Sequence, residues 1–468
     1  MIKRNKTLIT LIVIGLVAAS IVMVQTPQQS SATTGSTSQL QKLSLIMEIL
    51  QNKFVDPLLW NDMVDGAIEG VLSVTGDPYS QYLNPEDYNQ LSEGLSGDYV
   101  GVGIAVVEGP EGIKIVEVFE GTPAHRVGIK PSDIIVGIDG QDATDISIEK
   151  AVSLIKGEEG TTVTLKVDRA SRHLEFTVTR ERIHIAAVEW ELIEGSDVGY
   201  INVVTFSSGC EQEFEEAVDQ LKAAGATKLV LDLRDNPGGI VTEAVEVADF
   251  FLPPGAPVVT MKQRAATVRY RTDEDRAIEW PTVVLVNENT ASAAEFLAGA
   301  LQDYSMATVV GQQTFGKGTA QVVYSFTDGS GLKVTTAKFL TAAGRWVDGT
   351  GLAPTVIVER PQLRDLDGLL PYLDVERDDF RGMERATVGL DVLALQKALN
   401  LLGYQAGPED GVFGQLTEEA LKRFQAARDL PVGAAAGRDD IESLLSAFGE
   451  GGEDLELEKA LEILNFGS

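Results

Sequence analysis

Residues 228–240 read Lys-Leu-Val-Leu-Asp-Leu-Arg-Asp-Asn-Pro-Gly-Gly-Ile. The largely apolar run at 228–233 predicts a buried strand, and residues 240–251 have the apolar spacing of a helix. The Pro-Gly-Gly turn between them leaves backbone N–H groups free at the start of that helix. Such a turn can bind an anion or a developing oxyanion, although a tight strand-to-helix connection is the commoner role of this sequence.

The chain around this turn alternates strands with helices from residue 183 to residue 359. Apolar patterns predict strands at 198–204 and 282–286, helices at 212–223 and 291–304, and a β pair at 322–326 and 332–336. This order predicts an α/β core with antiparallel additions.

Other modules flank the core, so the predicted fold class is a multidomain α/β protein. Residues 40–96 form an N-terminal helical domain, whose apolar stripe is either ordinary core or the face of a homodimer. Residues 97–182 contain short runs divided by Gly and Pro, which predicts a compact, mostly β module. The remaining segments are a linker at 360–385, a small helical domain at 386–448 and an acidic tail at 449–468 with one amphipathic helix at 455–464.

The N-terminus predicts export. Three cations, Lys3, Arg4 and Lys6, precede an uncharged run at 7–24. A run of about 18 residues is long enough to cross a membrane, and the cations keep the N-terminus in the cytoplasm. We therefore predict a single-pass anchor at 1–24, a flexible linker at 25–39 and an extracytoplasmic remainder. A cleaved signal sequence is the alternative, and both interpretations export the protein.

Composition excludes several classes of function. The chain has 468 residues and a net charge of −32, so a phosphate backbone would be repelled and nucleic acid is not an expected partner. A single cysteine rules out an intrachain disulfide, and three histidines argue against a zinc cluster. We expect no metal and no cofactor.

A second strand–turn–helix junction places a serine at a helix start. Residues 289–295 read Asn-Thr-Ala-Ser-Ala-Ala-Glu, with Ser292 where the positive end of the helix dipole favours an alkoxide or oxyanion. Ser292 and Glu295 also fit the capping box S-x-x-E. Taken alone, the pattern favours the cap.

The third candidate is Lys317, in the segment 311–318 that reads Gly-Gln-Gln-Thr-Phe-Gly-Lys-Gly. This nearly matches a phosphate-binding P-loop, but Gly318 replaces the hydroxyl residue and the following residues alternate like a strand, so we reject that interpretation. A lysine can serve as base for a serine if burial lowers its pKa. Cys210 is a competing nucleophile, but without an activating histidine a structural role is favoured.

Several of these motifs occur together in a known order. The chain resembles the C-terminal processing peptidases, or tail-specific proteases, which are serine endopeptidases with a Ser–Lys dyad. The resemblance runs from about residue 40 to residue 359 and includes residues 76–80 (Gly-Asp-Pro-Tyr-Ser), 232–239, 290–295 and 314–321. Small departures at Thr290, Ala342 and Thr355 touch no proposed catalytic side chain.

This resemblance implies roles for five residues. Ser292 would be the nucleophile and Lys317 the general base, with Gln321 orienting the lysine or the serine. Gly238 and Ala293 would offer the backbone N–H groups of the oxyanion hole. The implied chemistry needs no cofactor.

The flanking modules resemble two binding domains. The β module is similar to a PDZ domain, in which the segment 99–104 would capture a substrate's C-terminal carboxylate through Val100, Gly101, Val102, Gly103 and Ile104, with strand addition alongside. Residues 389–425 resemble a peptidoglycan-binding helical module, but residues 431–440 depart from its pattern. Glycan binding and a purely structural bundle both stay open there.

These inferences predict an exported serine endopeptidase that recognises protein C-termini and cleaves by a Ser–Lys dyad. Its partners would be proteins or peptides with accessible C-termini, together with peptidoglycan and, through the N-terminal helix, the membrane. The alternative is a non-catalytic cell-envelope scaffold that binds protein C-termini and peptidoglycan. The PDZ module could deliver substrate or gate the protease.

Overall fold

The computed structural model describes residues 21–24, 34–109, 112–169, 172–358, 363–366, 368–375, 380–428, 430–450 and 454–466. The chain divides into two compact units. The first comprises Met1–Val309 and Gln313–Ala353, and the second comprises Val310–Gln312 and Pro354–Ser468.

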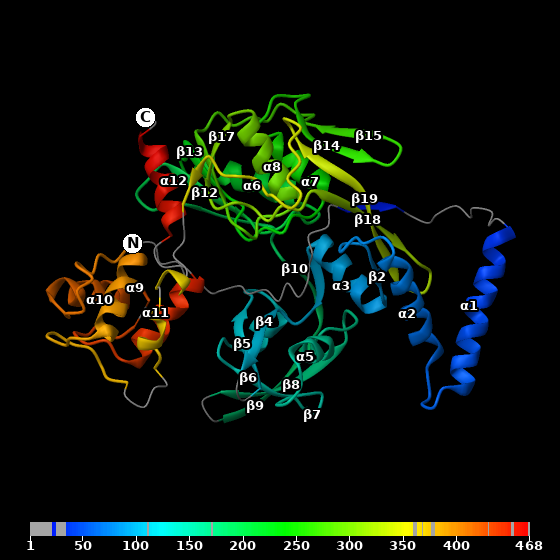
Figure 1. Ribbon diagram of the computed structural model, residues 1–468, viewed down its shortest axis with the longest axis horizontal. Helices are drawn as coiled ribbons and strands as arrows, with labels where there is room; N and C mark the ends of the chain where they lie inside the picture. The colour runs from blue at the N-terminus through cyan, green and yellow to red at the C-terminus, as the bar shows by residue number, and fades with distance from the viewer. Residues whose placement is uncertain are drawn as a thin grey trace. The chain divides into compact units, whose positions relative to one another are not determined.

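The centre of the first unit is a sheet in which five strands follow the order β11-β12-β13-β16-β17. Their bounds are Val188–Leu192, Val198–Val203, Lys228–Asp232, Thr282–Val286 and Ala307–Gly311. Strands β12, β13 and β16 run parallel, and every residue of β16 is buried, which explains its unbroken apolar sequence. Three helices lie against this sheet (Figure 1), namely α6 (Cys210–Ala223), α7 (Val241–Ala248) and α8 (Ala293–Asp303). The predicted α/β core is confirmed.

A second sheet carries the antiparallel additions. Its order is β1-β18-β19-β14-β15, with β2 also paired to β19. The bounds are Ile21–Val24, Thr319–Ser325, Gly331–Thr341, Pro257–Gln263, Thr267–Arg271 and, for β2, Gln81–Leu83. The predicted β pair is present. Strand β18 begins three residues before the predicted 322–326 and ends one residue sooner, and β19 extends beyond 332–336 in both directions.

The predicted anchor lies mainly outside the described residues. Its last four residues form β1, which pairs in parallel with β18 so that Ile21 stands opposite Gln321. For these four residues, the structure has a strand where we predicted a helix. Among the described residues, no helix combines the length and hydropathy that a membrane span requires.

Three helices precede the β module: α1 (Thr34–Lys53), α2 (Trp60–Ser73) and α3 (Pro85–Ser96). Because α1 begins at Thr34, the prediction of a flexible linker is wrong for residues 34–39. Most described apolar side chains of α1 are exposed, while Met47 is buried. The apolar stripe of α1 is thus not ordinary core, and a homodimer face stays a prediction.

The β module has the sheet order β4-β5-β6-β8-β9, with β7 paired to β6. The strands are Ile104–Gly109, Gly112–Val118, Ile134–Ile138, Thr162–Arg169, Arg172–Thr179 and, for β7, Gln141–Asp142. Helices α4 (Pro123–Val127) and α5 (Ile148–Ile155) accompany them. A ribbon of β3 (Asp98–Gly101) and β10 (Glu181–His184) joins the two ends of this module.

The second unit is mainly helical. It contains α9 (Leu390–Leu401), α10 (Gln415–Ala427), α11 (Arg438–Glu450) and α12 (Leu455–Phe466), and β20 (Val356–Ile357) pairs with the end of β17. The region predicted as a linker holds two short 3-10 helices, η1 (Leu363–Leu366) and η2 (Leu370–Tyr372). Leu366 and Leu373 are fully buried in the core of this unit, so the prediction of a plain linker is wrong there.

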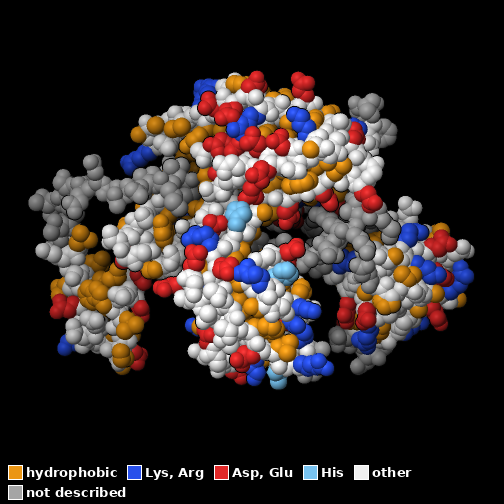
Figure 2. Space-filling view, turned by 180° about the vertical axis from the view of Figure 1, so that it is seen from behind, with side chains coloured by type: hydrophobic (Ala, Val, Ile, Leu, Met, Phe, Trp, Pro, Cys, Tyr) orange, Lys and Arg blue, Asp and Glu red, His pale blue; other side chains and the backbone are white. Residues whose placement is uncertain are grey.

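Acidic side chains are spread over the molecular face drawn in Figure 2, interspersed with cationic and apolar ones. The acidic side chains seen on this face are exposed to solvent.

Candidate active site

Ser292 stands on a sharp turn between β16 and α8. Its backbone has φ 55° and ψ −113°, a conformation that a non-glycine residue adopts at a cost of about 1–3 kcal/mol. Neighbouring hydrogen bonds hold the turn, because the N–H of Ala291 donates to the carbonyl of Asn236 at 2.9 Å and Thr290 Oγ1 donates to the carbonyl of Leu233 at 2.7 Å. The two residues before the strained serine are therefore fixed to the neighbouring turn.

Glu295 ties the serine to the lysine. Its Oε2 accepts the backbone N–H of Ser292 at 2.8 Å and the backbone N–H of Lys317 at 2.8 Å. Its Oε1 accepts Thr314 Oγ1 at 2.5 Å and the N–H of Gly316 at 2.8 Å. Burial raises the pKa of this carboxyl, and the four donors oppose that rise. The predicted capping contact from Glu295 back to Ser292 is present, and the same carboxylate also holds the lysine loop.

Lys317 is a buried amine with 1% of its surface exposed. Among the described residues, its Nζ has no hydrogen-bond partner, and it lies 4.9 Å from the ring centroid of Tyr79. The pKa of Lys317 is lowered to about 7, chiefly by burial and secondly by the positive charge of Lys333, while the carboxylates of Glu295 and Asp77 oppose the shift. At neutral pH a large share of this lysine is thus in the neutral form that a general base requires.

Gln321 lies on β18, four residues after Lys317 in the sequence. Its Nε2 donates to Thr319 Oγ1 at 3.2 Å and to Thr335 Oγ1 at 3.0 Å. Its Oε1 and the Lys317 Nζ are two of five buried side-chain atoms without a partner in the described chain. Buried polar atoms are normally satisfied, so an unpaired donor and an unpaired acceptor so near in sequence indicate a functional site.

The two predicted oxyanion donors differ in their present bonds. The N–H of Gly238 donates to Asn236 Oδ1 at 2.8 Å, so this group is engaged inside its own turn. Ala293 begins α8 directly after Ser292. Gly238 nevertheless lies against the nucleophile, since a Cβ built there would stand 2.8 Å from Ser292 Cβ. Gly238 could serve as a donor only after its N–H leaves Asn236.

The two strand–turn–helix junctions are joined by an Asp–Asn pair that sequence reasoning missed. The N–H of Asp235 donates to Asn287 Oδ1 at 2.9 Å, and Asn287 Nδ2 donates to Asp235 Oδ1 at 2.8 Å. Nearby, Arg234 pairs with Asp232 at 2.5 Å, and both side chains are buried. The Arg234–Asp232 pair therefore stabilises the first of these turns, and the Asp235–Asn287 pair fixes the first turn to the second.

Cys210 begins α6 and is fully buried. Burial raises the pKa of its thiol, and the carboxylates of Glu243, Glu213 and Glu211 raise it further. The thiol thus stays protonated, in agreement with the structural role that the sequence favours.

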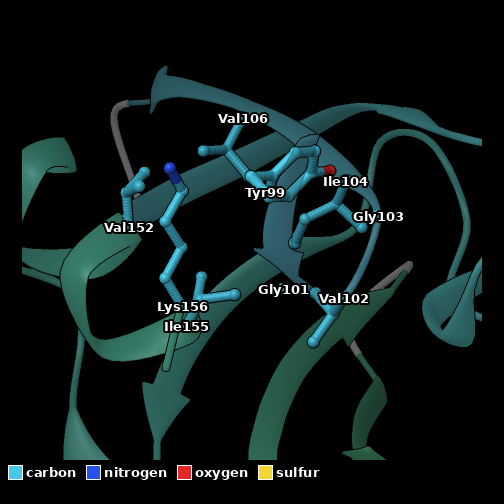
Figure 3. Close-up of a pocket in the computed structure, with 9 residues that line it drawn as sticks. All are labelled: Tyr99, Gly101, Val102, Gly103, Ile104, Val106, Val152, Ile155 and Lys156. Atoms are coloured by element: carbon cyan, nitrogen blue, oxygen red, sulfur yellow. The ribbon is translucent and has the colours of Figure 1, made fainter. Parts of the chain in front are cut away.

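The β module contains a pocket beside the predicted carboxylate loop (Figure 3). Its lining residues are Tyr99, Gly101, Val102, Gly103, Ile104, Val106, Val152, Ile155 and Lys156. Four of the five predicted residues line this pocket, while Val100 instead pairs with Arg182 in the ribbon. The structure adds Lys156, whose Nζ pairs with Glu93 at 2.5 Å, and Tyr99, whose ring lies beside it.

In the second unit, the polar residues of the peptidoglycan-binding pattern stabilise the helical fold. Gln396 is buried: its Nε2 donates to Asp410 Oδ1 at 3.1 Å and Thr417 Oγ1 at 3.1 Å, and its Oε1 accepts the N–H of Gly411 at 2.9 Å. These contacts explain the motif without a ligand, so glycan binding is not assigned by these residues.

Comparison with known families agrees with this arrangement. Residues 197–358 match peptidase family S41, residues 91–168 match the PDZ domain, and residues 388–439 match a peptidoglycan binding domain. Residues 16–87 match the N-terminal domain of the activating protease CtpB.

The chain is also similar to whole proteins. It is 33% identical over 440 residues to the carboxy-terminal processing protease CtpA of Bacillus subtilis, covering 93% of this chain and 92% of that protein. It is 34% identical over 400 residues to a CtpA-like serine protease of Staphylococcus aureus (strain MRSA252), covering 84% and 78%. A solved photosystem II D1 C-terminal processing protease is 27% identical, with a TM-score of 0.43 and coverage of 70% of this chain and 94% of that one.

Proposed function

Because the chain is a serine-type peptidase that belongs to the carboxy-terminal processing proteases of peptidase family S41, we propose that Ser292 is its nucleophile and Lys317 its general base. The observation that carries this assignment is the state of Lys317. Its amine is buried, has no partner among the described residues and has a pKa of about 7. The backbones of both residues are held by one oxygen of Glu295.

The proposed reaction follows acyl-transfer chemistry with two partners. Ser292 Oγ attacks the carbonyl carbon of the scissile bond, and its proton passes to Lys317 Nζ. The N–H of Ala293 stabilises the oxyanion, joined by that of Gly238 once its bond to Asn236 opens. The lysine ammonium then protonates the leaving amine, and a water activated by the neutral lysine hydrolyses the acyl-enzyme.

We further propose that the PDZ domain binds the free C-terminus of the substrate. The pocket lies at the predicted loop, and its apolar lining from Val102, Ile104 and Val152 suits an apolar terminal side chain. Strand addition along β4 would extend the contact to the residues that precede the terminus.

The test is cleavage of a peptide with an apolar C-terminus, with mass-spectrometric identification of the cut site. We expect Ser292→Ala and Lys317→Ala to abolish cleavage, whereas Ser208→Ala, at an exposed position, retains it. Amidating the peptide's C-terminus should raise KM if the PDZ pocket binds the carboxylate. A folded Ser292→Ala protein that still cleaves the peptide refutes the proposal.

The location of the protein is a separate proposal. The cations at the N-terminus and the uncharged run at 7–24 support a membrane anchor with the two units outside the cytoplasm. Fractionation and protease accessibility in intact cells test this, and recovery of the full-length chain in the cytoplasmic fraction contradicts it. The peptidoglycan-binding domain would hold the enzyme near the cell wall, which a pull-down on purified peptidoglycan tests.

The rival is a non-catalytic envelope scaffold, and the family membership does not favour it. A scaffold would have no need for a buried lysine whose backbone is held by the same carboxylate oxygen as that of a strained serine. It predicts that Ser292→Ala changes no measurable property, while binding to cell-wall material persists.

A further inference from the structure

The turn at residues 76–80, which reads Gly-Asp-Pro-Tyr-Ser, has no role in the reaction proposed above, although it lies beside the proposed base. The ring centroid of Tyr79 lies 4.9 Å from the Lys317 Nζ. The next residue, Ser80, accepts the backbone N–H of Thr335 on β19 through its Oγ at 3.0 Å. Two consecutive residues of the turn thus contact the lysine and β19, which places Thr335 near the proposed active site.

Thr335 stands directly opposite Gln321 where β18 and β19 pair. The pairing is irregular at this point: Ala320 stands opposite Ala337, so Thr336 has no opposite residue on β18. In a regular antiparallel pair, Gln321 would face Thr336 instead. Such a bulge changes the direction of side chains and is common next to active sites. The irregularity is therefore what brings Thr335 and Gln321 together.

Among the described residues, the buried side chain of Gln321 is hydrogen-bonded through its nitrogen alone. Its Nε2 donates to Thr335 Oγ1 at 3.0 Å and to Thr319 Oγ1 at 3.2 Å, which uses both amide protons. Its Oε1 is buried without a partner, and Lys317 Nζ is the one nitrogen among the buried atoms of the described chain in that state. The nitrogen end of the amide is thus anchored, and its oxygen end is left as an acceptor.

The other partners of Thr335 agree with this orientation of the amide. Ser80 Oγ, which accepts the Thr335 N–H, donates its own proton to Asp77 Oδ2 at 2.5 Å. Burial raises the pKa of Asp77, but hydrogen bonds from the side chains of Ser80 and Thr335 help to lower it below its ordinary value. A carboxylate only accepts, so the Thr335 hydroxyl gives its proton to Asp77 and its oxygen accepts from Gln321. An amide oxygen at that place would set two acceptors against each other.

We propose that Thr335 is a positioning residue of the active site: it holds the nitrogen end of the Gln321 amide and thereby keeps the Oε1 free as an acceptor for the reaction. This inference rests on the proposed function and on a part for Gln321 in it. When Lys317 takes the proton of Ser292, its buried ammonium needs an acceptor, and an amide oxygen is one that adds no charge. The inference also gives the turn at 76–80 a function, since this turn holds Thr335 in place.

The test is peptide cleavage by Thr335→Val, with kcat and KM measured separately. Valine keeps the shape of threonine and suits a strand, but it lacks the hydroxyl, so Thr319 alone would hold the amide. We expect kcat to fall about tenfold through the loss of one buried hydrogen bond, with KM unchanged because the amide acts on the reacting groups. Thr336→Val is the matched control and should keep the wild-type kcat. It makes the same change one residue along β19, where the side chain has no hydrogen bond to the described residues.

Two further experiments separate positioning from packing. Thr335→Ser loses a methyl group but keeps the hydroxyl, so it should retain the wild-type kcat. Gln321→Ala removes the group through which Thr335 acts and should itself lower kcat. Adding Thr335→Val to Gln321→Ala should then have no further effect, because two substitutions that break one interaction are not additive. Circular dichroism checks that each variant is folded.

Three results would overturn the inference. The first is a wild-type kcat in folded Thr335→Val. The second is an equal loss in Thr335→Ser, which would show that packing and not the hydroxyl is responsible. The third is a full tenfold effect of Thr335→Val in the Gln321→Ala background, which would show that Thr335 does not act through the amide. Ser292→Ala is assayed in parallel: cleavage by that variant refutes the proposed function itself, whereas an inactive Ser292→Ala with an unaffected Thr335→Val refutes only the role of Thr335.

Discussion

Glu295→Gln tests whether one carboxylate aligns the nucleophile with the base. The substitution keeps the shape of the side chain but replaces one oxygen by an NH₂ group. Glu295 is fully buried, and each of its oxygens accepts two hydrogen bonds. Whichever way the amide turns, its NH₂ faces two donors, either the N–H groups of Ser292 and Lys317 or the Thr314 and Gly316 pair.

The cost follows from the bonds that are lost. A hydrogen bond to a charged group contributes about 1.5–3 kcal/mol, so losing two of them costs roughly 3–6 kcal/mol. Part of this cost lowers the free energy of unfolding, and part displaces Ser292 from Lys317. A misplacement of about 1 Å at reacting groups can reduce the rate by about 100-fold. We therefore expect a lower Tm together with a loss of at least about 100-fold in kcat/KM.

The assay separates these two effects. Peptide cleavage is measured well below the Tm of the variant, where circular dichroism shows that the protein is folded. Glu288→Gln is the control, because Glu288 is exposed in the turn before Ser292 and undergoes the same change of charge. A folded Glu295→Gln protein with wild-type kcat/KM would refute the alignment role. If activity falls only in proportion to the fraction of protein that is unfolded, Glu295 stabilises the fold and does not align the two residues.

Three further predictions concern Gly238, Cys210 and Gln396. In Gly238→Ala, where φ is +102°, the added Cβ would lie 2.8 Å from Ser292 Cβ. The nucleophile would be displaced, so kcat/KM should fall about 100-fold. Gly255→Ala is the control and should retain activity, because Gly255 also has a positive φ, +80°, but open space around it. Cys210→Ala should leave kcat/KM unchanged, because the buried thiol stays protonated, and inhibition of the wild type by a thiol reagent at Cys210 would contradict this. Gln396→Leu removes the bonds of this side chain to the buried Thr417 and Gly411 and to the exposed Asp410, so it should lower the unfolding free energy of the second unit by roughly 3 kcal/mol. Urea denaturation measures this, and an unchanged midpoint would show that those bonds contribute nothing.

The local patterns of the core could be predicted from the sequence. The strand at 282–286 has the predicted bounds, and the helix predicted at 212–223 begins only two residues earlier, at Cys210, because the apolar pattern is strong in both. The segments around Ser292 (289–295) and Lys317 (311–318) were also recognisable as candidate catalytic segments, since small residues interrupt a regular apolar pattern in each. What local patterns could not reveal is that Glu295 joins them.

The contacts that surround Lys317 were beyond local prediction. Tyr79 belongs to another module, and tertiary contacts of that module with β19 bring its ring to the lysine. Lys333 reads as one polar position in an alternating strand, with no local sign that it is buried. The hydrogen bond from Gly238 to Asn236 likewise depends on the exact path of the turn.

The most direct test of the central claim is covalent trapping of the nucleophile. The full-length protein is treated at neutral pH with a serine-directed fluorophosphonate, and the modified residue is located by mass spectrometry. We predict modification at Ser292 in the wild type and its loss in folded Lys317→Ala, because the serine needs the neutral lysine as its base. Modification at another serine, or equal labelling of Ser292 without Lys317, would contradict the Ser292–Lys317 dyad.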